Sequence, residues 1–129
     1  DNNQTTVYRT LRDDESIVDG LVAKNPDRGM TMSGHISSGS RNNGSQFIST
    51  TTEINVAKKW ASKDGKRVVS INLEMLPSNT KVYDVSTDIG RAKYLSGATA
   101  NRLAKSSSEV LIEGYIPAEA LELLFDFGG

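Results

Sequence analysis

The segment that most constrains the fold is residues 107–117, SSEVLIEGYIP, in which a glutamate stands directly before three large apolar residues. An uninterrupted Val-Leu-Ile run is typical of a strand buried on both faces, and the serines before it favour a turn. We therefore expect Glu109 at the entrance of a buried strand, packed on one side and open to a cleft on the other. A glutamate that opens a strand is usually solvated, so this segment alone leaves a solvated and a catalytic Glu109 both open.

Length and composition exclude several kinds of chemistry. The chain has 129 residues, the size of one domain, so we interpret residues 1–129 as a single domain. It has no cysteine and one histidine, which excludes disulfides and a thiol nucleophile and argues against a zinc site, so we expect no metal. The formal net charge is -1, without the basic stripe of nucleic-acid binders. No apolar run approaches the roughly 18 residues of a membrane span, and the polar residues 1–6 are linker-like, as expected of a domain cut from a longer protein.

Arg9 lies in the first predicted strand, residues 7–11. Alternation places it on the same side as the apolar Val7 and Leu11. An arginine in this position either extends outward over the edge of the core or is held inward by an anionic partner, and both alternatives stay open.

A helix is predicted after this strand, capped by Asp13 or Asp14 and ended by Asn25–Pro26. Its apolar stripe would comprise Ile17, Val18, Leu21 and Val22. Residues 27–46 then form a polar stretch rich in Gly, Ser and Asn, which indicates a functional or mobile loop. His35, inside this stretch, could bind a ligand phosphate or ribose, or satisfy a local backbone carbonyl.

Three hydroxyls end the next predicted strand, residues 46–51: Ser49, Thr50 and Thr51. Thr50 and Glu53 have the spacing of a capping box, which predicts a helix with an inner face of Ile54, Ala57, Trp60 and Ala61. A strand-to-helix corner presents free backbone N–H groups, which favour an anionic ligand. The alternative is that the threonines only cap the helix.

The remaining predicted elements are strands at residues 67–75, 82–85 and 121–127 and a helix over 87–105. Candidate core residues of this helix are Ile89, Ala92, Leu95 and Leu103. One face of the last strand would carry Leu121, Leu123, Phe125 and Phe127. Short strands that do not alternate regularly with helices argue for an α+β domain.

Three of these segments, in this order, resemble the Arg-Ser-Glu class of mono-ADP-ribosyltransferases, which includes cholera toxin, related bacterial toxins and the vertebrate arginine-directed enzymes. They are Tyr8-Arg9 on the first strand, the aromatic-x-Ser-Thr-Thr strand that ends in Ser49–Thr51, and Ser107-x-Glu109-Val-Leu-Ile. The match spans almost the whole chain, and its most specific part is the Glu-Val-Leu-Ile segment followed by Pro117. His35 is similar in placement to a histidine near the NAD site of the cholera-toxin branch.

The resemblance implies a fold of two small, roughly perpendicular antiparallel sheets flanked by helices, with NAD as the co-substrate in the cleft between them. It implies that Glu109 is catalytic, that Ser49 orients its carboxylate and that Arg9 contacts the phosphate or ribose region of NAD. The NAD-binding set that it implies is Arg9, His35, Ser49, Thr50 and Thr51.

Residue 107 departs from the family pattern. Many members that modify arginine carry Glu or Gln two residues before the catalytic glutamate, on the acceptor side, where this chain has Ser107. A serine cannot act as a base toward a guanidinium acceptor, so the departure speaks against arginine specificity and not against NAD cleavage.

The leading hypothesis is thus a toxin domain, of the polymorphic-toxin type used in interbacterial competition, that transfers ADP-ribose from NAD to a macromolecule, with protein favoured over nucleic acid as the acceptor. One alternative is an NAD glycohydrolase that uses water as the acceptor, motivated by Ser107. Another is a non-catalytic binding module on the same fold, with residues 27–45 as its recognition surface. A secreted or delivered effector of this kind would act in the target-cell cytoplasm, and the resemblance implies a cognate immunity protein.

Overall fold

The structure is a computed structural model that describes residues 5–38, 45–64 and 66–127. The strands are β1 (Thr6–Thr10), β2 (Leu21–Val22), β3 (Phe47–Thr51), β4 (Arg67–Asn72), β5 (Val82–Asp84), β6 (Glu109–Glu113), β7 (Tyr115–Ile116) and β8 (Leu121–Asp126). The helices are α1 (Met32–Ser38), α2 (Ile54–Asp64), α3 (Asp88–Tyr94) and α4 (Ala98–Ser107), and single 3-10 turns occupy Leu73–Met75 and Ala118–Ala120.

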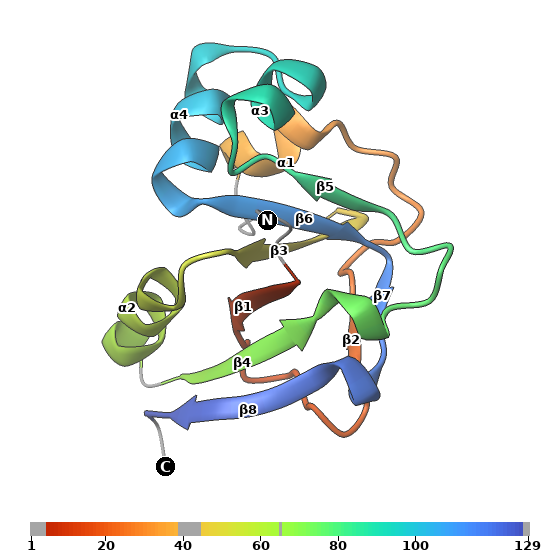
Figure 1. Cartoon of the computed structure of the whole chain (residues 1–129), viewed down its shortest axis with the longest axis vertical. Coiled ribbons are helices and arrows are strands. Elements are labelled where there is room, and N and C mark those ends of the chain that lie inside the picture. Colours follow the sequence, from red (N-terminus) through yellow and green to blue (C-terminus); the bar gives the residue numbers. More distant parts are fainter. Residues whose placement is uncertain (1–4, 39–44, 65, 128–129) are drawn as a thin grey trace.

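Six of the strands form an antiparallel sheet in the order β5-β6-β3-β1-β4-β8, and β2 pairs with β7 in a separate two-stranded sheet. The central pair, β1 with β3, is joined at Tyr8 and Thr51, whereas β3 pairs with β6 and β1 with β4 along their full lengths. The large sheet therefore consists of two three-stranded halves that meet at one point (Figure 1). This architecture confirms the α+β class with antiparallel sheets.

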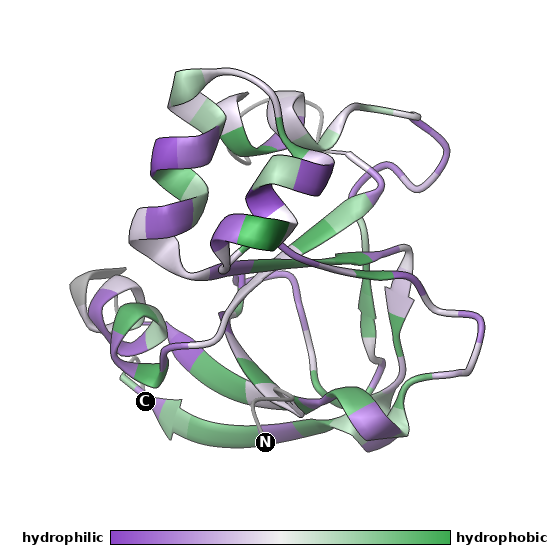
Figure 2. Ribbon diagram, turned by 45° about the horizontal axis from the view of Figure 1, so that its top comes forward, coloured by the Kyte–Doolittle hydropathy of each residue, from purple (hydrophilic) through white to green (hydrophobic). Residues whose placement is uncertain are grey.

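The helices cover the two halves separately. Helices α1, α3 and α4 gather beside β5 and β6, while α2 lies beside β1, β3 and β4 (Figure 1). In Figure 2 the strands carry continuous apolar stretches, whereas apolar and polar residues alternate along the helices. One core lies between β1, β3, β4, β6 and the small sheet, a second under α1 and α4, and a third under α2. Positions on the two faces of β3 thus enter different cores, which decides where each of its hydroxyls points.

The predicted helix over residues 13–25 is wrong. This segment instead turns, forms a bridge between Ser16 and Gly20, and continues into β2, where Leu21 pairs with Ile116. Gly20 has φ +77°, and a Cβ there would lie 2.7 Å from the Ile116 carbonyl oxygen, so the close approach to β7 requires glycine. Val18 is 80% exposed, because no helix carries it inward.

Two further helix predictions change in detail. Part of the polar stretch is helical: α1 contains His35, while residues 39–44 lie outside the described residues. The helix predicted over 87–105 is divided into α3 and α4 by Gly97, which has φ +87°. Leu95 and Leu103 pack inward as predicted, but Ile89 is 83% exposed and Ala92 is also exposed. The break changes which side of each short helix meets the sheet.

The last strand also differs from the predicted pattern. A bulge against Val68 and Val69 of β4 shifts the alternation of β8. Leu121 therefore packs on the core beside β1 and β4, whereas Phe125 packs on the opposite core under α2. The apolar residues of this strand serve two faces of the sheet instead of one.

Candidate active site

Arg9 is held inward at the junction of the two half-sheets. Its Nη1 donates to the carbonyl oxygen of Ser49 at 2.8 Å, and its Nη2 forms an ion pair with Glu15 at 3.2 Å. The Arg9 side chain is 12% exposed and that of Glu15 is 6% exposed. Burial lowers the pKa of Arg9 from its usual value, and the Glu15 carboxylate opposes this shift. Of the two alternatives left by the sequence, the structure therefore shows the inward-held arginine with an anionic partner.

The loop after β1 fixes Glu15 in place. Glu15 accepts a hydrogen bond from the Arg12 backbone N–H at 2.8 Å, and Arg67 donates to the carbonyl oxygens of Arg12 and Glu15 at 3.0 and 2.7 Å. Arg9 thus points at a preformed carboxylate. One donor is left over, because the Arg9 Nε is buried without a hydrogen-bond partner in the described part of the chain.

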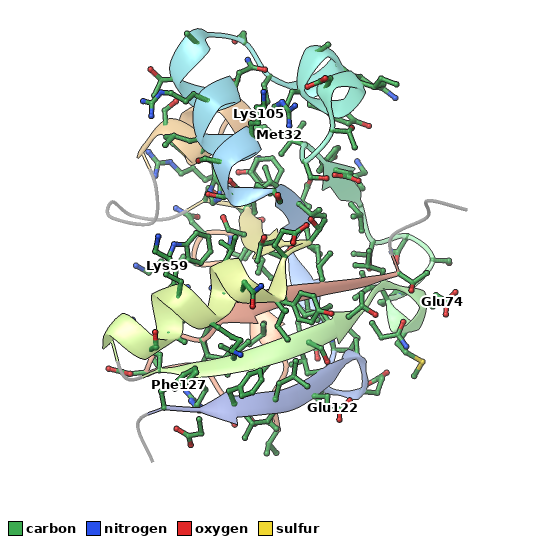
Figure 3. All side chains as sticks on the ribbon, turned by 60° about the vertical axis from the view of Figure 1, so that its left-hand side comes forward. Met32, Lys59, Glu74, Lys105, Glu122 and Phe127 are labelled. Atoms are coloured by element: carbon green, nitrogen blue, oxygen red, sulfur yellow. The ribbon has the colours of Figure 1, made fainter. Side chains whose placement is uncertain are left out.

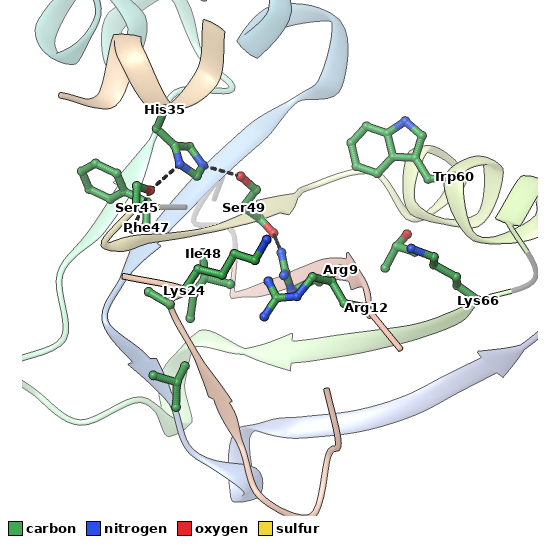
Figure 4. Close-up of a pocket in the computed structure, with 13 residues that line it drawn as sticks. Arg9, Arg12, Lys24, His35, Ser45, Phe47, Ile48, Ser49, Trp60 and Lys66 are labelled. Carbon is green, nitrogen blue, oxygen red and sulfur yellow. Dashed lines mark hydrogen bonds between the residues drawn. The ribbon is translucent and has the colours of Figure 1, made fainter. Parts of the chain in front are cut away.

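Ser49 connects Arg9 to His35. His35 Nε2 lies 2.7 Å from Ser49 Oγ, and His35 Nδ1 lies 2.5 Å from Ser45 Oγ (Figure 4). The Ser45 oxygen also accepts the Phe47 backbone N–H at 3.1 Å. Ser45 is buried, so its hydroxyl hydrogen needs an acceptor, and among the described residues this acceptor is His35 Nδ1.

These contacts favour one direction of a hydrogen-bond chain, which depends on the His35 tautomer. A ring whose Nδ1 accepts carries its proton on Nε2, which then donates to Ser49 Oγ. The Ser49 hydroxyl is in turn free to donate toward Glu109, its diagonal neighbour on β6, an interaction that lowers the Glu109 pKa in part. Burial, together with the positive charge of Arg9, lowers the pKa of His35 to about 4. His35 is therefore neutral at physiological pH.

Glu109 is buried and not solvated. It opens β6 directly after Ser108, which has φ 47° and ends α4. Thr51 pairs with Glu109 and Ser49 with Leu111, so Ser49 and Glu109 are diagonal neighbours on one face of the sheet. Burial raises the pKa of Glu109 to about 7, and the hydrogen bond from Ser49 lowers it in part. A carboxyl group that titrates near neutrality is well suited to catalysis.

The two threonines hold the backbone around Glu109. Thr50 Oγ1 donates to the Val110 carbonyl at 2.7 Å, and Thr51 Oγ1 donates to the Ser107 carbonyl at 2.6 Å. The Thr51 hydroxyl also accepts the Glu53 N–H at 3.1 Å. The helix α2 begins directly after Glu53, whose carbonyl oxygen accepts the Val56 and Ala57 N–H groups. The predicted capping box with Thr50 is wrong, because Thr50 faces the opposite core. Ser107, half-buried at the end of α4, lies in the turn that Thr51 fixes.

A cavity of about 260 Å³ opens beside Ser49 (Figure 4). It is lined by Arg9, Thr10, Arg12, Val22, Ala23, Lys24, His35, Ser45, Phe47, Ile48, Ser49, Trp60 and Lys66. Of the predicted site residues, Arg9, His35 and Ser49 are in its wall. Thr50, Thr51, Ser107 and Glu109 are not, and Glu109 is connected to the cavity through Ser49. Among the described residues, the wall carries cations from four side chains and no carboxylate, which suits an anionic ligand.

Sequence reasoning missed five contributors to this site: Arg12, Glu15, Lys24, Ser45 and Lys66. Glu15 follows Arg9 by six residues with no periodic relation to it, and Ser45 comes ten residues after His35 across a segment outside the described residues. No local pattern signals such contacts. The inward-held alternative for Arg9 was the one available signal, since it calls for an acidic partner close by.

Within the described residues, no cluster of three or more His, Cys, Asp or Glu residues could hold a metal ion. None of the described helices is long and apolar enough to cross a membrane.

Comparison with known proteins places the chain in a family. Residues 3–127 match the family described as "Domain of unknown function (DUF7587)", and the chain belongs to it. The solved structure of EcPltA is similar to this chain, with a TM-score of 0.61 and 18% sequence identity over 94% of this chain and 74% of EcPltA. This likeness shows an ADP-ribosyltransferase-like fold. No curated protein matches the chain by sequence.

Proposed function

We propose that this chain is an NAD-dependent mono-ADP-ribosyltransferase of the Arg-Ser-Glu class, a toxin or effector domain that transfers ADP-ribose to a macromolecule. The observation that carries the proposal is the convergence on Ser49: its carbonyl accepts from Arg9, its hydroxyl is hydrogen-bonded to His35, and Glu109 is its diagonal neighbour on β6. The likeness to EcPltA supports it further, since PltA is an ADP-ribosyltransferase toxin subunit.

Glu109 supplies the electrostatic part of the reaction. Departure of nicotinamide breaks the bond from its ring nitrogen to the ribose, and the bonding electrons leave with the nicotinamide. The ribose becomes oxocarbenium-like, and a fixed carboxylate stabilises this positive charge. Ser49 orients the carboxylate by donating to it, and neutral His35 keeps the Ser49 hydroxyl free for that donation. The acceptor atom then forms the new bond to the ribose and loses a proton.

The cations of the cavity wall act on the other part of NAD. Arg9, Arg12 and Lys24 line the cavity beside Ser49 and would hold the pyrophosphate. Thr50 and Thr51 act as positioning residues, because their hydroxyls hold Val110 and the turn at Ser107.

The acceptor side gives weight to a second candidate function. Ser107 has no basic side chain to activate an acceptor, and this favours hydrolysis, with water as the acceptor. For the transferase, we propose a protein acceptor and a cognate immunity protein that covers the cleft. Delivery as an effector into a target-cell cytoplasm belongs to the same proposal.

The test is nicotinamide release from NAD by the purified chain, alone and with a cell lysate. We expect the Glu109→Gln variant to release nicotinamide at least about a hundredfold more slowly, as for loss of other charge-stabilising groups. The matched control is Glu113→Gln at the other end of β6, whose carboxylate accepts from Tyr83, and it should keep most of the activity.

The pattern of release separates the candidates. Acceleration by lysate, with labelled ADP-ribose on a lysate component, indicates the transferase, whereas equal rates with and without lysate indicate the glycohydrolase. No release in either setting from a folded chain contradicts both and leaves the binding module.

A further inference from the structure

The backbone around Glu109 is held at four consecutive carbonyl groups. Lys105, labelled in Figure 3, lies in the last turn of α4, after which the chain enters β6 at Glu109. The carbonyls of residues 107–110 each accept a hydrogen bond, in this order from the Thr51 hydroxyl at 2.6 Å, the Thr52 N–H at 3.0 Å, the Val85 N–H at 3.1 Å and the Thr50 hydroxyl at 2.7 Å. Three of these donors lie on β3 or directly after it. The donor to the Glu109 carbonyl comes instead from Val85, directly after β5, so on this side the Glu109 backbone is fixed as firmly as Val85 is.

Arg91 holds Val85 from the side of α3. Val85 is completely buried, and its carbonyl oxygen accepts from Arg91 Nη1 at 3.1 Å. The Arg91 side chain is 7% exposed, and its Nη2 forms an ion pair with Asp88, whose side chain is 93% exposed. Because water does not reach a buried carbonyl, loss of Arg91 would leave this oxygen without its donor. One guanidinium thus connects the helix to the residue that donates to Glu109.

Gly90 allows α3 to come close enough for this contact. A Cβ at this position would lie 1.8 Å from the Asp84 carbonyl oxygen at the end of β5, so a larger residue would collide with the strand. Thr87 caps the helix by accepting the Gly90 N–H at 3.0 Å. Helix α3 therefore lies directly beside β5, as Figure 1 shows, and Arg91 reaches back to Val85.

We propose that Arg91 is a positioning residue for Glu109: through Val85, it fixes the backbone that carries the reacting carboxylate. This assignment rests on the proposed function, in which Glu109 stabilises the oxocarbenium-like ribose. Such stabilisation requires a carboxylate that is already in place and does not reorganise during the reaction. Arg91 itself touches neither NAD nor the acceptor, so its loss should affect the rate of the chemical step and not the binding of NAD.

Amide hydrogen exchange, followed by NMR, measures this connection without any turnover. Arg91→Met fills much of the same volume but has no donor, so the Val85 amide should exchange at least about tenfold faster than in the unaltered chain. The Leu11 amide, which donates to the Arg67 carbonyl at 2.9 Å in the other half-sheet, is the internal control and should keep its rate. A substitution that only destabilises the whole chain would accelerate both amides.

The kinetics of nicotinamide release provide the second measurement. Arg91→Met should lower kcat roughly ten- to hundredfold and leave KM for NAD nearly unchanged, because a displaced carboxylate loses transition-state stabilisation while the cavity keeps its cations. Arg91→Lys retains a donor for the Val85 carbonyl and should recover most of kcat. The matched control is Asp88→Asn on the same helix, which removes the charged partner of Arg91 but not the contact with Val85. It should change neither kcat nor KM.

The assignment is overturned if the Val85 amide exchanges no faster in Arg91→Met, if Leu11 accelerates equally, or if kcat stays normal while Val85 exchanges faster. Equal losses of kcat in Arg91→Lys and Arg91→Met, or an effect confined to KM, would also contradict it. The proposed function fails separately, when the folded, unaltered chain releases no nicotinamide. In that case the exchange rates still show whether Arg91 holds the Glu109 backbone.

Discussion

The two sides of Ser49 bury titratable groups in opposite ways. On the side of its carbonyl, Arg9 and Glu15 are buried together as an ion pair, and the shift that burial causes in the pKa of Arg9 is opposed by its partner. On the side of its hydroxyl, His35 and Glu109 are buried with neutral hydrogen-bond partners, so desolvation dominates. The pKa of His35 falls to about 4 and that of Glu109 rises to about 7.

The difference shows how one residue can join a charged region to a neutral one. A buried charge persists where a counter-charge is fixed next to it, and is suppressed where only dipoles are available. The charged side suits permanent contact with an anionic ligand. The hydroxyl side keeps a carboxyl group that can gain or lose charge during a reaction cycle.

The largest effect is expected from breaking the ion pair. Glu15→Ala leaves Arg9 buried without its counter-charge, which should reduce the free energy of unfolding by about 3–5 kcal/mol in urea denaturation. Asp14→Ala is the matched control, because Asp14 pairs with Arg12 through a side chain that is 72% exposed, and it should change stability little. Equal effects of the two substitutions would show that the pair is not buried in solution.

On the hydroxyl side of Ser49, removing the charge of Glu109 should stabilise the folded chain, whereas removing the charge of Glu15 destabilises it. Raising the pKa of Glu109 from 4.5 to about 7 costs the folded state about 3 kcal/mol once the carboxyl is ionised. The free energy of unfolding of the unaltered chain is therefore free of this cost below pH 4.5, where the carboxyl is protonated in both states. It falls by this amount as the pH rises through 7. Glu109→Gln should therefore be more stable than the unaltered chain above pH 7, with a difference that vanishes below pH 4.5. A variant that is less stable at pH 8 contradicts the burial of an unpaired carboxylate.

The same group predicts a pH dependence of activity. If the carboxylate is the reactive form, kcat/KM for nicotinamide release should rise with pH through about 7 and then level. A rate that falls as the pH rises through 7 would mean that the protonated acid is required, and would contradict the charge-stabilising role of Glu109.

His35 should make the free energy of unfolding rise with pH, which is the opposite of the dependence expected from Glu109. The pKa of His35 is lowered from 6.5 to about 4, so the unfolded chain binds more protons between these values, and stability is lost as the pH falls through that window. This slope offsets that of Glu109 over much of the range. In unfolding curves measured from pH 4 to 7, His35→Gln should lose stability with rising pH, and Glu109→Gln should gain it. If the stability of both variants changed with pH in the same direction, His35 and Glu109 would not be shifted in opposite ways.

The sequence was informative where a face of a strand decides the outcome. Strict alternation put Arg9 on the core side of β1, and the Val-Leu-Ile run put Glu109 at the start of a buried β6, as the structure has them. The predictions from sequence were wrong where a shift of one residue along a strand changes the face or the contact of a side chain. Thr51 and not Thr50 accepts the Glu53 N–H in the turn before α2, and a single bulge sends Phe125 to the opposite core from Leu121.

Contacts between distant segments could not be predicted from local patterns. Glu15 directly follows Asp13 and Asp14, and an aspartate pair before apolar residues predicts the start of a helix. Only the folded chain, with Gly20 packed on the Ile116 carbonyl, shows why the helix does not form. Ser45 is one of several serines in a polar stretch, and nothing in its sequence context distinguishes the one that contacts His35.

The smallest effect is the position of one proton. His35 is the only histidine of the chain, so its ring nitrogens can be observed alone by 15N NMR. We expect the Nε2–H tautomer at pH 7, because Ser45 donates to Nδ1. Ser45→Ala removes this donor and should increase the Nδ1–H form, with a stability change of only about 1 kcal/mol. A ring that is already Nδ1–H in the unaltered chain would reverse the hydrogen-bond chain. Ser49 would then donate to His35 and could not donate to Glu109, whose pKa would rise further, and the hydroxyl side would no longer be prepared for a carboxylate.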